Sequence, residues 1–108
     1  MLLQLPIVLA AVLPGLPAGN NVPKIDIVRE CRAEVGNKDA QQRCVDDEKQ
    51  TLKQLRSEWP QFNADDRSRC YQETTLGGIG SYAEFLTCLE MARDTRNQHQ
   101  QSAQKSQK

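Results

Sequence analysis

"SYAEFLTCLEMARD", residues 81–94, is the stretch that decides the fold of this 108-residue chain. Its large apolar side chains recur at the i, i+3, i+4 and i+7 spacing of one helical face, and they are Tyr82, Phe85, Leu86 and Leu89. This is the strongest periodicity in the sequence, and convincing strand-like alternation occurs nowhere along it. The sequence therefore predicts an all-α fold that contains a helix in this stretch.

Local signals predict where this helix begins. Ser81, followed three residues later by Glu84, forms a capping box, which is typical of a helix N-terminus. The preceding residues 76–80, LGGIG, hold three glycines in four positions, and their backbone entropy is too large for a regular element. We expect a loop at 76–80 and a helix from Ser81.

A first helix is expected near the start of the charged part of the chain. Pro23 suits the first turn of a helix, and Gly36-Asn37 suits a left-handed stop after it. Between them, four residues stand at helical spacing: Ile25, Val28, Arg32 and Val35.

Two further helices are expected before the loop at 76–80, which makes a bundle of about four helices. Asp39 is a good N-cap for a helix that runs to Trp59, where Pro60 ends it. The apolar stripe of this helix consists of Cys44, Val45, Leu52, Leu55 and Trp59. Asn63, with Asp66 three residues on, begins the next helix.

The two ends of the chain differ from its middle. Residues 1–19 contain none of the 14 Lys and Arg or 14 Asp and Glu residues, and the apolar run at 2–13 is shorter than the roughly 20 residues of a membrane span. A secretory signal peptide at 1–18 fits better than a buried N-terminal helix of a cytosolic protein. We therefore expect a bacterial periplasmic or secreted protein with a helical domain at 19–96. The polar segment 97–108 is expected to be a disordered tail.

Four cysteines lie in the predicted mature part: Cys31, Cys44, Cys70 and Cys88. An even number in a short exported chain is typical of disulfides, and neither spacing matches the close ligand pairs of a zinc site. In two antiparallel helical hairpins, Cys31 would lie as far from its turn as Cys44 does. Cys70 and Cys88 would lie at similar distances from the second turn. This favours the pairs Cys31–Cys44 and Cys70–Cys88, although pairing Cys31 with Cys88 and Cys44 with Cys70 stays open.

Patterns for catalysis are weak. His99 lies in the polar tail, where a general base would lack a rigid, dry setting. Asp46-Asp47-Glu48 is expected on the wet face of a helix and Asp65-Asp66 in a first turn, where carboxylates favour the helix dipole. The glycines at 76–80 lack the Lys-Ser/Thr that follows a phosphate-binding loop. We expect no catalytic residues.

The aromatic side chains allow two interpretations. Trp59, Tyr82 and Phe85 could line a ligand groove between the hairpins, but their helical spacing is more typical of a core. The formal net charge is zero, which gives no basic stripe for nucleic acid and no polybasic patch for a membrane surface.

A resemblance adds to this interpretation. The residues that carry it are Cys31, Cys44 with Glu48, Leu55 with Trp59 and Phe62, RSRC at 67–70, and the stretch 81–94. Over about residues 27–96 the chain resembles a family of small exported four-cysteine helical proteins of rhizobia and related alphaproteobacteria. The resemblance implies an envelope or periplasmic setting and an all-helical fold, and it brings no known activity, substrate or catalytic residue.

The hypothesis that follows is a non-enzymatic helical protein with a structural or protein-interaction role. One alternative is a metal or redox protein that uses the four cysteines as thiolates, and another is a periplasmic stress chaperone. We expect no metal and no cofactor, and the sequence carries no signal for a specific partner or oligomeric state.

Overall fold

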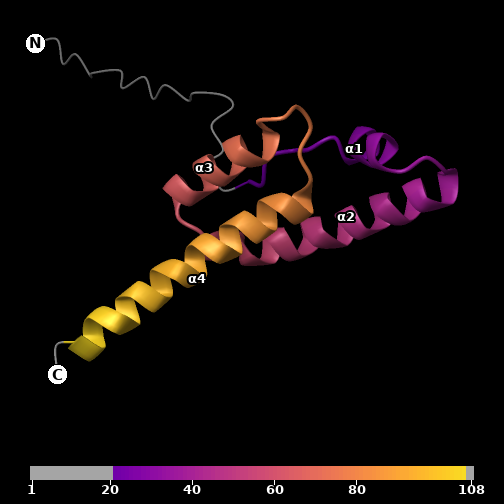
Figure 1. Ribbon diagram of the computed structural model, residues 1–108. Coiled ribbons are helices and arrows are strands. Elements are labelled where there is room, and N and C mark those ends of the chain that lie inside the picture. The colour runs from indigo at the N-terminus through magenta and orange to yellow at the C-terminus, as the bar shows by residue number, and fades with distance from the viewer. Residues whose placement is uncertain (1–20, 107–108) are drawn as a thin grey trace, which may run out of the picture.

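The structure is a computed structural model that describes residues 21–106, so the predicted signal peptide at 1–18 lies outside the described residues (Figure 1). Every regular element of this part is helical, which confirms the all-α prediction. In chain order the elements are α1 (Ile27–Glu34), α2 (Lys38–Glu58), the short 3-10 helix η1 (Trp59–Gln61), α3 (Ala64–Thr75) and α4 (Tyr82–Ser106).

The four α-helices form two hairpins. One hairpin is α1 with α2 and the other is α3 with α4, and α4 also packs against α2 (Figure 1). Helix α4 is therefore the element that joins the two hairpins, with α3 and α2 both in contact with it. Its C-terminal half extends beyond the other helices (Figure 1). None of the helices in residues 21–106 combines the length and apolar content needed to cross a membrane.

The core fills the space between α4, α2 and α3. Its buried residues are Ile25, Leu55, Trp59, Phe62, Cys70, Tyr82, Phe85, Leu86 and Leu89. Phe85 is fully buried, and its ring makes edge-to-face contacts with Trp59 and Tyr71, with ring centroids 5.8 Å apart in each pair. The interpretation of Trp59, Tyr82 and Phe85 as core residues is therefore confirmed.

Helices α3 and α4 begin as predicted. The side-chain oxygen of Asn63 accepts a hydrogen bond from the Asp66 N–H at 2.8 Å, and Ser81 Oγ accepts one from the Glu84 N–H at 3.1 Å. The loop before α4 depends on its glycines. A Cβ on Gly80 would lie 2.8 Å from the carbonyl oxygen of Thr74, so only glycine allows this close approach.

The predicted boundaries of α1 and α2 were wrong by a few residues. Helix α1 begins after Asp26, whose carboxylate accepts the Arg29 N–H at 3.2 Å, and the Ile25 N–H before it donates to the Tyr82 hydroxyl at 2.8 Å. Asn37, rather than Asp39, caps α2 by accepting the Ala40 N–H at 2.7 Å. The turn between them is extended at Val35 and contains no left-handed residue.

The polar C-terminal segment also differs from expectation. Helix α4 continues to Ser106, where the sequence predicts a disordered tail from residue 97. The segment holds neither glycine nor proline and is rich in Gln, which is a good helix former, so nothing in it stops the helix. Residues 97–105 are exposed, and this helical extension therefore adds length to α4 without adding to the core.

Candidate functional site

Two disulfides hold the hairpins closed. Cys31 and Cys44 join α1 to α2, and Cys70 and Cys88 join α3 to α4, with Cα atoms 5.6 Å apart in both pairs. The predicted pairing is confirmed and the rival pairing is excluded. Since each bridge lies within one hairpin, each fixes the position of one helix along the axis of its partner helix. All four sulfur atoms are paired, so none is a free thiol in this structure.

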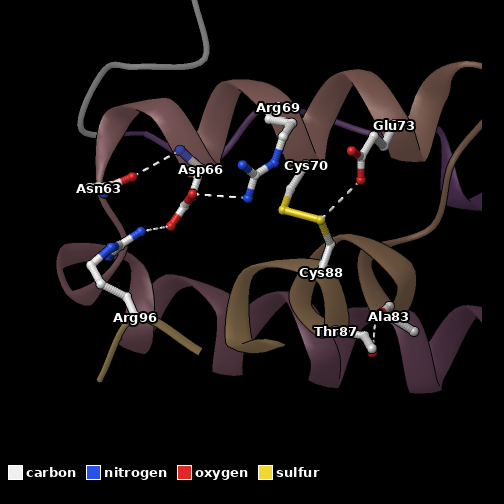
Figure 2. The surroundings of a disulfide bond; sticks show 9 residues. All are labelled: Asn63, Asp66, Arg69, Cys70, Glu73, Ala83, Thr87, Cys88 and Arg96. Atoms are coloured by element: carbon white, nitrogen blue, oxygen red, sulfur yellow. Dashed lines mark hydrogen bonds and ion pairs between the residues drawn. A yellow bond between two sulfur atoms is a disulfide. The ribbon is translucent and has the colours of Figure 1, made fainter. Parts of the chain in front are cut away.

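An open groove of about 950 Å³ runs between α3 and α4. The Cys70–Cys88 disulfide lies between the two helices, and Cys88, which is half-buried, belongs to the groove lining (Figure 2). The small and apolar lining residues all come from α4, and they are Ala83, Thr87, Met91, Ala92 and Thr95. Met91 is 66% exposed, so a large apolar side chain is available at the middle of the groove.

Asp66 closes the groove at the end where α3 begins. Its carboxylate is buried, forms an ion pair with Arg69 at 3.0 Å, and forms a second ion pair with Arg96 of α4 (Figure 2). The prediction that Asp66 lies in the first turn of α3 is confirmed, and the structure adds that the carboxylate is buried and paired with a cation from α4. Together with the disulfide, this pair fixes α3 to α4 at two points along the groove.

Glu73 lies beside the disulfide. One of its carboxylate oxygens is 3.6 Å from the Cys88 sulfur (Figure 2). A disulfide sulfur carries no proton, so this is a contact rather than a hydrogen bond. A thiolate that attacked the bridge from the groove would meet the negative charge of Glu73, and a thiolate released on Cys88 would be destabilised by it. The carboxylate therefore opposes reduction of this bridge.

Glu48 is buried on α2, contrary to its predicted place. It was expected on the wet face of α2, but its side chain is buried and accepts the Tyr82 N–H at 2.6 Å. Burial raises the pKa of Glu48, and the charges of Glu34 and Glu84 raise it further, while the N–H groups at the start of α4 act in the opposite direction. Glu48 thus caps α4 from α2, in addition to the local cap from Ser81.

Further glutamates surround this cap. Burial raises the pKa of Glu30 on α1, and a hydrogen bond with Glu34 and the charges of Glu84 and Glu48 raise it too. Of these glutamates, only Glu84 belongs to the lining of the groove. Within residues 21–106, no group of three or more His, Cys, Asp or Glu side chains is arranged to hold a metal ion.

On its other side, α4 is attached to the end of α2 by arginine. Arg93 donates to Glu58 and to Gln61, both at 2.9 Å, and its guanidinium lies 5.4 Å from the centre of the Phe62 ring. Burial alone would raise the pKa of Glu58, but the hydrogen bonds from Arg93 and Gln54 outweigh it and hold that pKa below its ordinary value. These contacts leave the groove side of α4 uncovered.

His99, the only histidine, lies on the helical extension of α4 and is exposed at the end of the groove beyond Arg96. The groove was not predictable from hydrophobic periodicity, because all its lining residues except Met91 are small or polar. No protein family, curated protein or solved structure matches the chain. The resemblance to exported four-cysteine proteins of alphaproteobacteria therefore stays a prediction.

Proposed function

We propose that this chain is a non-enzymatic, exported interaction module that binds a protein segment in the groove between α3 and α4. The observation that carries the proposal is the exposure of Met91 on a floor of small residues, Ala83, Thr87, Ala92 and Thr95, in a groove rimmed by charged side chains. A large apolar side chain surrounded by a polar rim is typical of a contact surface.

The groove is also rigid enough to bind without reorganising. The Cys70–Cys88 bridge and the ion pair of Asp66 with Arg96 hold its two walls together. A surface that is fixed before binding loses less conformational entropy on association than a mobile one. This supports recognition as the role of the hairpin.

The disulfides support export. Two bridges in a chain of this size are typical of oxidising compartments such as the bacterial periplasm or the extracellular space. The predicted signal peptide at 1–18 and the resemblance to exported bacterial proteins point the same way. The alternative in which the cysteines act as thiolate ligands would first require both bridges to be reduced.

Site-specific photocrosslinking in the exporting bacterium tests the proposal. A benzophenone side chain replaces Thr87, which is exposed within the groove, and in a control variant it replaces Lys53, which is exposed on α2 outside the groove. We expect protein adducts from position 87 and not from position 53. Equal adducts at both positions, or none at position 87, would contradict a role for the groove in binding.

A further inference from the structure

The charges along the groove are not evenly distributed. Its end near the start of α4 carries Glu73 and Glu84, with no cation among the lining residues there. Its other end carries Arg69 and Arg96, which share the single carboxylate of Asp66, and then His99. The groove is therefore acidic at one end and basic at the other, with neutral residues between them.

Met91 lies close to the midpoint of this gradient. Glu84 precedes it by seven residues and His99 follows it by eight, which is about 10 and 12 Å along the helix axis at 1.5 Å per residue. A helix laid antiparallel against α4 and centred on Met91 would bring position 84 of each chain opposite positions 98 and 99 of the other. Glu84 of each chain would then face His99 of the other, a formally neutral side chain that can donate a hydrogen bond to the carboxylate, with Arg96 one helical turn nearer to Met91.

We propose that the occupant of the groove is a second copy of this chain, related by a two-fold axis that passes close to Met91. This inference rests on the proposed function, because it names the partner of the same groove. In a two-fold interface the same surface is used on both subunits, so the surface must be complementary to itself. The distribution of Glu84, Met91 and His99 along α4 meets that requirement.

Two further observations favour a copy of the chain over a different partner. The formal net charge is zero, so two copies meet without overall repulsion. The extension of α4 beyond Arg96 is exposed, yet it continues the face that carries Glu84 and Met91. A copy centred on Met91 would cover residues 97–100 of this extension, which the hairpin with α3 does not bury. Methionine at the axis suits a self-contact because its flexible side chain adapts to its symmetry mate.

The test is the oligomeric state of the oxidised, purified protein in sedimentation velocity across a dilution series. We expect a reversible dimer, and we expect Met91→Asp to weaken it at least about tenfold, because two carboxylates would meet at the axis. Leu76→Asp is the matched control, since Leu76 is 87% exposed but lies outside the groove, and it should leave the dimer unchanged.

A charge exchange tests the antiparallel arrangement. Glu84→Lys should weaken the dimer, and adding His99→Glu in the same chain should restore it, because the two positions meet across the axis. Circular dichroism and a mass measurement of both disulfides establish that each variant is folded. A monomer at every concentration, a dimer that Met91→Asp does not weaken, or a double variant no stronger than Glu84→Lys would overturn the inference.

The two proposals can fail separately. A crosslinked adduct from position 87 that contains a different protein, found together with a monomeric purified chain, would refute the second copy and leave the interaction module standing. An adduct with the mass of two chains, which Met91→Asp removes and Leu76→Asp does not, would support both. A monomer that also forms no adduct from position 87 would refute both.

Discussion

The bridge between Cys70 and Cys88 provides the sharpest test of what stabilises this fold. It closes a loop with a sequence separation of 18, which contributes about 3 kcal/mol to the free energy of unfolding by restricting the unfolded chain. Cys70 also belongs to the main core and is fully buried, so replacing both cysteines by alanine removes packed sulfur atoms at a further cost of about 1 kcal/mol. The double variant Cys70→Ala/Cys88→Ala should therefore lose about 4 kcal/mol.

The other bridge supplies an independent test of the same reasoning. Cys31 and Cys44 have a sequence separation of 13, and the chain-entropy contributions of the two loops differ by only about 0.3 kcal/mol. Cys31 is fully buried, as Cys70 is, so Cys31→Ala/Cys44→Ala should also lose packed sulfur and about 4 kcal/mol in total. The two double variants are therefore expected to be destabilised by nearly equal amounts.

Urea unfolding followed by circular dichroism measures both losses. A small domain of this length has a net stability of about 5–10 kcal/mol, so loss of either bridge leaves it marginal and loss of both leaves it largely unfolded. A loss below about 1 kcal/mol for Cys70→Ala/Cys88→Ala would refute the claim that the bridge stabilises the fold. A loss from one bridge more than about 2 kcal/mol larger than that from the other would refute the claim that loop closure and burial of one cysteine contribute equally in the two hairpins.

Three other predictions concern individual side chains. Burial raises the pKa of Glu48, so the contribution of this side chain to the free energy of unfolding should be full below the ordinary glutamate pKa of 4.5 and should decline as pH rises through the raised pKa. Glu48→Gln should flatten this pH dependence in urea titrations. Glu73→Gln should speed reduction of Cys70–Cys88 by anionic thiols and leave the other bridge, an internal control in the same mass assay, unchanged. Gly80→Ala should cost about 1–3 kcal/mol in thermal unfolding, whereas Gly77→Ala, whose added Cβ meets nothing within 4 Å, should cost much less.

The parts of the fold that were predicted correctly depend on interactions between residues close in sequence. Asn63 and Ser81 cap their own helices three residues away, and the disulfide pairing follows once two hairpins are assumed. The contact that holds the segment before α1 was not predicted. The Ile25 N–H donates to Tyr82, a residue 57 positions away, and no local pattern reports such a contact.

The buried carboxylates show how the missed residues could have been found. Glu48 follows Cys44 by four residues and precedes Leu55 by seven, so it lies on the apolar stripe of α2 rather than on its wet face. A charged residue at such a position indicates a partner in another element, here the N-terminus of α4. Asp66 gave no comparable signal, because its burial depends on how far α4 extends past the hairpin.

Helix α4 explains why stability and the proposed recognition should be separable in this protein. Phe85, Leu86 and Leu89 point into the core, while Thr87 and Met91 line the groove, because residues one and two positions apart lie on different faces of a helix. The face toward the core is fixed by packing, by the Glu48 cap and by Arg93. Substitutions at Met91 should therefore change binding without unfolding the domain, and a loss of helicity in Met91→Asp would show that the groove face also stabilises the fold.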